Sequence, residues 1–143
     1  MRGRRLGVVL AALPALAYAQ ATSVPFGEGH DRTQPVEITA DRLDLDQAAG
    51  TAVFVGNVRV GQGELRLAAD RVEVFYVEGS GGANGEVQRM VANGNVTLSN
   101  GTEAAEANEA VYEVAAGKVA MQGDVLLTQG KSALSSETLN IDL

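Results

Sequence analysis

The sequence predicts an all-β fold in which about a dozen short antiparallel strands follow one another in serial hairpins. Three observations predict it. Apolar and polar residues alternate along the chain from residue 35 onward, Gly-Asn and Gly-Asp pairs punctuate this alternation, and helical periodicity is absent after the first 19 residues. Alternation with period two is typical of strands that bury one face.

An internal repeat organises the chain. Each copy has a glycine-containing turn, an alternating strand and a polar step residue that is followed by a second alternating strand. The step residues are Asp41, Asp70, Asn108 and Glu137, at spacings of 29, 38 and 29 residues. Each copy needs neighbours to cover its apolar face, so the repeats are expected to stack.

The alternation changes phase at each step residue. Around Asp70 the apolar positions are Leu65 and Leu67 before the step, and Val72 and Val74 after it. A flat strand would turn one of these sets to solvent, so we expect a bulge or bend at the step. We interpret the step residues as turn formers rather than catalytic groups, and the Gly-Asn and Gly-Asp pairs as tight hairpin turns that need positive φ.

A glycine-rich insertion over residues 78–85 accounts for the longer middle interval. We interpret it as a flexible surface loop. A phosphate-binding loop is the alternative, but the stretch lacks the Lys-Ser/Thr pair and the following helix that such a loop uses.

The first 19 residues have the form of a cleaved secretory signal. Three arginines precede an apolar run over residues 6–16, and Ala17-Tyr18-Ala19 matches a small-x-small cleavage site before Gln20. A retained membrane anchor is the alternative, but it needs about 18 or more apolar residues. We therefore expect a signal peptide at 1–19, a flexible leader at 20–34 and one folded domain at 35–143.

Composition excludes several classes of function. Cleavage removes three of 11 basic residues and none of the 18 acidic ones, which leaves 8 against 18 and a net charge of −10. This balance argues against nucleic acid as a partner and against charge-driven binding to anionic membranes. The chain has no cysteine, so disulfides, thiolate metal sites and a lipoprotein signal are excluded.

The sequence does not predict an enzyme, a metal site or a cofactor. The single histidine, His30, lies in the predicted leader without neighbouring ligands, and we expect it to be solvated. No cysteine nucleophile or Ser-His-Asp set is present. The paired acids Asp44 and Asp46 fall on one face of a predicted strand, as they would on a solvated surface.

Residues 35–143 resemble the OstA-like family of lipopolysaccharide-transport proteins. The resemblance rests on Pro35-Val36-Glu37-Ile38-Thr39-Ala40-Asp41-Arg42-Leu43, on the Gly-Asn-Val turns and on the recurring Ala-Asp-x-Val-x-Val step. It implies an open, twisted antiparallel β-jelly roll in the periplasm, whose hydrophobic trough carries the lipid A acyl chains of lipopolysaccharide from the inner to the outer membrane. It also implies head-to-tail self-association and docking onto related β-jelly-roll domains of the inner-membrane and outer-membrane transport components.

The resemblance further implies which residues line the trough. They are Ile38, Leu43, Phe54, Val58, Val60, Leu65, Leu67, Val72, Val74, Val96, Leu98, Tyr112, Met121, Leu127, Leu134 and Ile141. The residues alone leave two alternatives open, a slot for alkyl chains or an interior packed against itself. The corresponding functions are a lipid-carrying bridge or a structural β-repeat assembly module with a solid core and no lipid cargo.

Acyl burial is expected to dominate lipid binding. Each buried methylene contributes about 0.8 kcal/mol, whereas the cations Arg42, Arg66 and Arg71 are scattered along the sequence. Glu103 occupies the position that Leu65 holds in an earlier repeat; we attribute this to an error in the aligned register and expect Glu103 to face outward. The sequence stops at Leu143 on an apolar alternating strand, which predicts an open edge ready for strand pairing, although a shortened chain would look the same.

Overall fold

The structure is a computed structural model that describes residues 23–25, 31, 33–79 and 85–143. The predicted signal peptide, His30 and the centre of the glycine loop at 80–84 lie outside the described residues. The backbone N–H of Val77 donates to the carbonyl oxygen of Glu86 at 2.8 Å and thereby closes the base of that loop.

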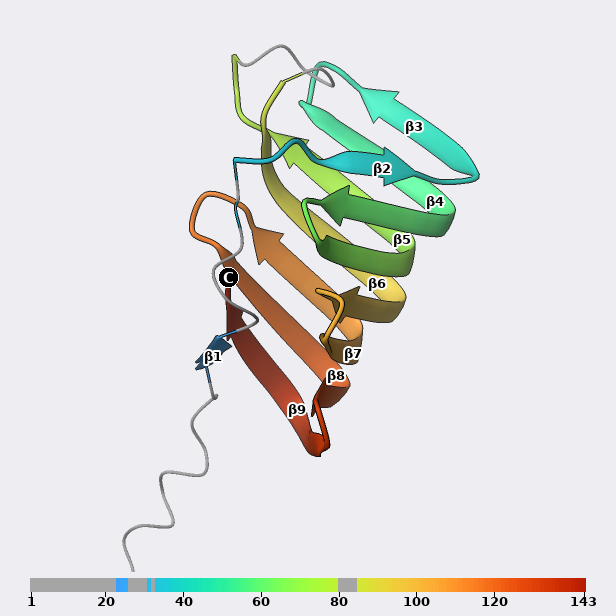
Figure 1. Ribbon diagram of the computed structural model, residues 1–143. Helices are drawn as coiled ribbons and strands as arrows, with labels where there is room; N and C mark the ends of the chain where they lie inside the picture. Colours follow the sequence, from blue (N-terminus) through green and yellow to red (C-terminus); the bar gives the residue numbers. More distant parts are fainter. Residues whose placement is uncertain (1–22, 26–30, 32, 80–84) are drawn as a thin grey trace, which may run out of the picture.

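The described residues form nine strands in one sheet and no helix (Figure 1). The strands are β1 (Ser23–Pro25), β2 (Glu37–Thr39), β3 (Arg42–Asp46), β4 (Thr51–Gln62), β5 (Leu65–Tyr76), β6 (Val87–Ser99), β7 (Glu103–Glu113), β8 (Lys118–Gln129) and β9 (Ser132–Asp142). Their order is β1-β9-β8-β7-β6-β5-β4-β2, and β3 also pairs with β4. All pairs are antiparallel except β1 with β9, so the antiparallel all-β prediction is confirmed for eight strands.

The strands are fewer and longer than predicted, because the Gly-Asn and Gly-Asp pairs are not hairpin turns. Strands β4 to β9 have 11 to 13 residues each. The pairs Gly56-Asn57, Gly94-Asn95 and Gly123-Asp124 lie inside β4, β6 and β8, where the pairing register shifts. All six residues have positive φ, as predicted, but they form β-bulges, in which two residues oppose one on the next strand.

These bulges line up across the sheet and form a crease at which the long strands bend. Figure 1 shows the strands curving back along this line. The crease divides the sheet into two limbs. The first limb contains β3 and residues 51–55, 71–76, 87–93, 109–113, 118–122 and 138–142, and the second limb contains β2 and residues 58–62, 65–69, 96–99, 103–107, 125–129 and 132–136.

The core lies between the two limbs. Leu65 and Leu67 point inward from the second limb, and Val72 and Val74 point inward from the first, each at most 4% exposed. The phase change in the alternation is therefore confirmed, because the bulge rotates the chain so that both halves of a strand bury their apolar side chains on the same side.

Part of the predicted flexible leader is a strand. Residues 23–25 form β1, which pairs in parallel with residues 140–142 of β9. The sequence of the leader has no apolar alternation, but the last strand of an open sheet presents unpaired backbone groups, and β1 satisfies some of them. Residues 23–25 of the expected leader are thus part of the sheet.

Candidate functional site

Most of the predicted trough residues lie in the interior between the limbs. Those that are buried are Val58, Val60, Leu65, Leu67, Val72, Val74, Val96, Leu98, Tyr112, Met121, Leu127 and Ile141. Ile38 and Phe54 are partly buried against this core. The lining implied by the resemblance omits Ala52, Met90 and Val119, which are equally buried and continue the same period-two pattern.

The remaining two predicted lining residues lie at opposite ends of the sheet. Leu43 of β3 is 50% exposed and Leu134 of β9 is 54% exposed. Leu43 pairs with Phe54 and Leu134 pairs with Leu127, so both lie on the inner side of the sheet. The apolar inner surface is therefore uncovered at both terminal strands, and Leu45, 44% exposed, extends it on β3.

Three of the step residues, Asp41, Asp70 and Asn108, sit at the crease against the bulge glycine of a neighbouring strand. The Nδ2 of Asn57 donates to the Oδ2 of Asp41 at 3.0 Å. At Gly56, a Cβ atom would lie 2.7 Å from the same carboxylate oxygen. Glycine is needed there both for its φ of +87° and for this close approach. The step residues thus stabilise the bend between the limbs.

A mouth lies opposite the crease, where the free ends of the two limbs meet. Tyr112 of the first limb donates a hydrogen bond from its hydroxyl to the Oε1 of Gln62 in the second limb, at 2.7 Å. The Nε2 of Gln62 donates to the backbone carbonyl of Gln34 at 3.0 Å. Gln62 is 2% exposed and is the one buried polar or charged side chain among the described residues.

The space beneath this polar pair is small. A cavity of about 10 Å³ lies between Gln62, Tyr112 and the apolar residues Leu67, Met90 and Leu98. That volume does not exceed what a single water molecule needs. Acyl chains therefore enter this part of the interior only if the limbs or their side chains move apart.

Sequence reasoning missed Gln62, although a signal was present. The inward set of β4 runs Val58, Val60, Gln62, so a polar residue ends an otherwise apolar series. A polar residue that closes the inner column of a strand marks the place where the interior meets solvent. Its hydrogen-bonding partner, 50 residues away, was not predictable from this pattern.

Glu103 also belongs to the mouth, and the expectation that it faces outward is wrong. It starts β7 with the same parity as the buried Ala105 and Ala107, so the aligned register was correct. Its carboxylate accepts hydrogen bonds from the side-chain amides of Gln129 and Asn100. Because Glu103 lies at the end of the strand, these partners satisfy it at the rim rather than in the core.

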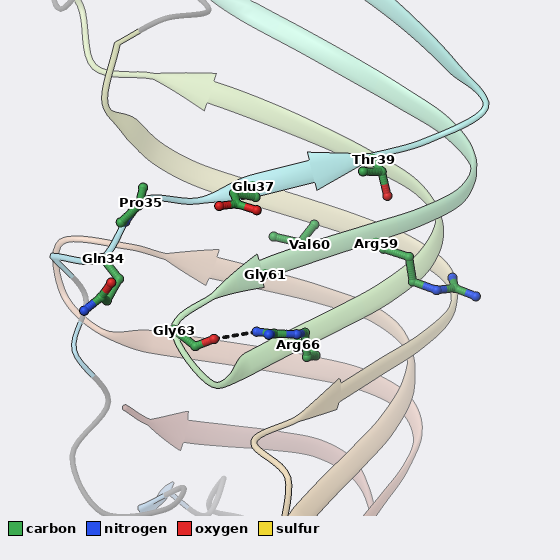
Figure 2. A pocket seen from close by; sticks show the side chains of 9 residues that line it. All are labelled: Gln34, Pro35, Glu37, Thr39, Arg59, Val60, Gly61, Gly63 and Arg66. Carbon is green, nitrogen blue, oxygen red and sulfur yellow. Dashed lines mark hydrogen bonds between the residues drawn. The ribbon is translucent and has the colours of Figure 1, made fainter.

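A groove of about 300 Å³ lies on the outer side of the sheet, over β2, β4 and β5 (Figure 2). Glu37 and Arg59 line it, and Gly61 forms part of its floor. The Nη1 of Arg66 donates to the backbone carbonyl of Gly63 at 2.6 Å, as Figure 2 shows. The groove has both charge signs at its walls, and Val60 lines both the groove and the interior cavity.

The other cations weighed in the sequence also lie outside the core. Arg42 forms an exposed ion pair with Asp44 at 3.4 Å. Arg71 is exposed on β5, next to the buried Val72. The charge of these arginines is thus directed away from the inner face.

Three further observations bear on the site. Within the described ranges, no three His, Cys, Asp or Glu side chains are grouped so that they could hold a metal ion. Burial raises the pKa of the hydroxyl of Tyr76, the last residue of β5. No helix among the described residues has the length and apolar character needed to cross a membrane.

The sequence over residues 37–143 matches the family model described as "LptA/(LptD N-terminal domain) LPS transport protein". The chain belongs to this family. The resemblance to OstA-like proteins is thereby confirmed. Its relatives in Escherichia coli and Pseudomonas aeruginosa are lipopolysaccharide export system proteins.

Individual relatives agree with the family assignment. An uncharacterized protein of Rhizobium meliloti is 30% identical over 142 residues, which cover 96% of this chain and 76% of that protein. The lipopolysaccharide export system protein LptA of Escherichia coli K12 is 28% identical over 128 residues, which cover 83% of this chain and 66% of LptA.

A solved structure confirms the fold. The crystal structure of LptH, described as the LptA homologous periplasmic component of the lipopolysaccharide transport device of Pseudomonas aeruginosa, superposes with a TM-score of 0.70. The match covers 80% of each chain at 21% sequence identity. The open β-jelly-roll prediction is therefore confirmed.

Proposed function

We propose that this protein is a periplasmic bridge that carries lipopolysaccharide from the inner to the outer membrane, with the acyl chains held between the two limbs. The observation that carries the proposal is the arrangement of the apolar inner faces. They converge from both limbs, are joined along the crease and remain uncovered at both ends, at Leu43 and Leu134. Membership of a lipopolysaccharide-transport family supports the same cargo.

The cargo binds through its acyl chains. Each methylene removed from water contributes about 0.8 kcal/mol, so several chains of ordinary length supply ample binding free energy. The residues that line the proposed trough are the buried and partly buried ones of the inner face, together with Leu43 and Leu134 at its two ends. No catalytic step and no cofactor is needed for this task.

The two ends of the sheet are suited to head-to-tail assembly. Within the described residues, β1 covers only residues 140–142 of the outer edge of β9. The rest of that edge, from Ser132 to Thr138, is exposed and carries Leu134 on its inner side. A strand of the next copy, or of a related domain in the inner-membrane or outer-membrane component, would pair with this edge and cover the leucine.

Export fits the same role. The proposed cleavage after Ala19 releases the mature chain into the periplasm. The N-terminal residue of the purified mature protein tests this step. Gln20 at the first position supports it, and an uncleaved chain contradicts it.

A structural module with a solid core is the second candidate. One observation favours it, namely the cavity of only about 10 Å³ beneath Gln62 and Tyr112. Equilibrium binding of purified lipopolysaccharide to the mature protein separates the two functions. Saturable binding that a fatty-acyl probe competes away supports the bridge, whereas no binding of either lipid supports the solid-core module.

A further inference from the structure

We propose that Gln62 and Tyr112 form a polar subsite at the mouth of the trough, and that it hydrogen-bonds the amide, ester or hydroxyl groups at the root of an entering acyl chain. The inference rests on the proposed function, because it assigns a specificity to the same trough. It concerns the groups that join acyl chains to a headgroup, not the chains or the phosphates.

The subsite is built by both limbs. Gln62 is the last residue of β4 in the second limb, and Tyr112 is the penultimate residue of β7 in the first. Both side chains are 2% exposed, and their hydrogen bond of 2.7 Å joins the limbs. The limbs cannot separate at this point without breaking that bond.

Breaking the bond carries a cost that depends on the cargo. A buried polar group left without a partner costs about 1–3 kcal/mol. A plain alkyl chain that parts the limbs offers Gln62 and Tyr112 no hydrogen bond. A chain with a carbonyl or hydroxyl group at this depth offers these two side chains a new hydrogen-bond partner, because an amide and a phenol can each both donate and accept.

The polarity gradient around the pair orients the cargo. Leu67, Leu98 and Met90 lie beneath it and are at most 4% exposed. Glu103 and Gln129, which are bonded to each other, lie on the same rim of the second limb. An acylated lipid with its chains directed toward the crease therefore places its linkage groups beside polar side chains, while its headgroup stays outside.

Two probes of equal chain length test the subsite. In one, a fluorophore is joined directly to an alkyl chain; in the other, it is joined through a hydroxyl-bearing acyl amide. We expect the mature protein to prefer the acyl amide. Tyr112→Phe and Gln62→Leu should each lower this preference about five- to tenfold, the equivalent of one hydrogen bond, without weakening the binding of the alkyl probe.

The control variants distinguish a loss of the polar subsite from a loss of folding or of lipid binding. The double variant Gln62→Leu/Tyr112→Phe removes both partners of this hydrogen bond and also the bond from Gln62 to the Gln34 carbonyl. It should lose the preference and stay folded, with a lower unfolding temperature than the unaltered protein. Thr97→Val, on the outer side next to Leu98, should leave the preference unchanged. A preference that survives in the double variant, or an equal loss for both probes, overturns the subsite. Failure of the unaltered protein to bind either probe overturns the proposed function itself.

Discussion

Asp70 and Asn95 are hydrogen-bonded across neighbouring strands at the crease, with 2.9 Å between the Asn95 Nδ2 and the Asp70 Oδ2. The same contact joins Asn57 to Asp41 one strand pair earlier. Both asparagines follow a glycine in a bulge, and their φ angles are +46° and +47°. The bend between the limbs is therefore fixed by a repeated polar contact as well as by the apolar core.

Asn95 has two roles, a hydrogen bond to Asp70 and a backbone conformation at positive φ, and two replacements separate them. Asn95→Ala removes the hydrogen bond and leaves a Cβ at positive φ without the polar side chain that lets asparagine tolerate this conformation, so we expect a loss of about 1–2 kcal/mol in the free energy of unfolding. Asn95→Gly also removes the hydrogen bond, but glycine adopts positive φ without strain, so this variant should cost less. Urea denaturation measures both, and equal losses would mean that the backbone conformation contributes nothing.

Gly94 should be the least replaceable residue of its bulge. An added Cβ would lie 2.6 Å from the Asp70 Oδ2, and the φ of Gly94 is +86°. Gly94→Ala should therefore cost more stability than Gly130→Ala, where φ is +60° and no atom lies within 4 Å of the added Cβ. The backbone strain alone is worth about 1–2 kcal/mol in both variants. Thermal unfolding of the two variants compares them, and equal midpoints would contradict the close approach.

The strand content, the inner columns and the bend at the step residues follow from the sequence alone. The alternation around Asp70 requires a change of face, and period two identifies Leu67 and Val74 as inward residues whatever the exact pairing. The bulges were predicted as hairpin turns, because a Gly-Asn pair at positive φ fits a hairpin turn and a bulge equally well. Only the partner across the sheet, Asp70 for Asn95, distinguishes them.

The residues that meet at the mouth could not be predicted from the sequence. Glu103 and Gln62 end the inner columns of their strands, and their polarity reflects the rim that the fold creates there. The contact between Gln62 and Tyr112 depends on how the two limbs fold over each other, which the alternation within one strand does not encode. The parallel pairing of β1 with β9 likewise depends on a free edge rather than on the leader's own sequence.

Leu134 tests assembly without disturbing the core. It is 54% exposed on β9, so Leu134→Asp should leave the fold intact. In a head-to-tail contact the carboxylate would be buried without a partner, and self-association should weaken about tenfold or more. Sedimentation velocity over a concentration series measures this. Ser135→Asp adds the same charge on the opposite side of the same strand and should have a smaller effect; equal effects would place the contact elsewhere.

The central claim is that acyl chains lie on the inner side of the bent sheet. Phe54 and Phe75 are in the first limb on neighbouring strands, but Phe54 packs against the core, whereas Phe75 faces outward with the Arg89 guanidinium 4.4 Å from its ring centre. A photocrosslinking phenylalanine analogue at each position, irradiated with bound lipopolysaccharide, tests the claim most directly. We expect crosslinks at position 54 and none above background at position 75. Crosslinking confined to position 75, or equal at both positions, would contradict the account.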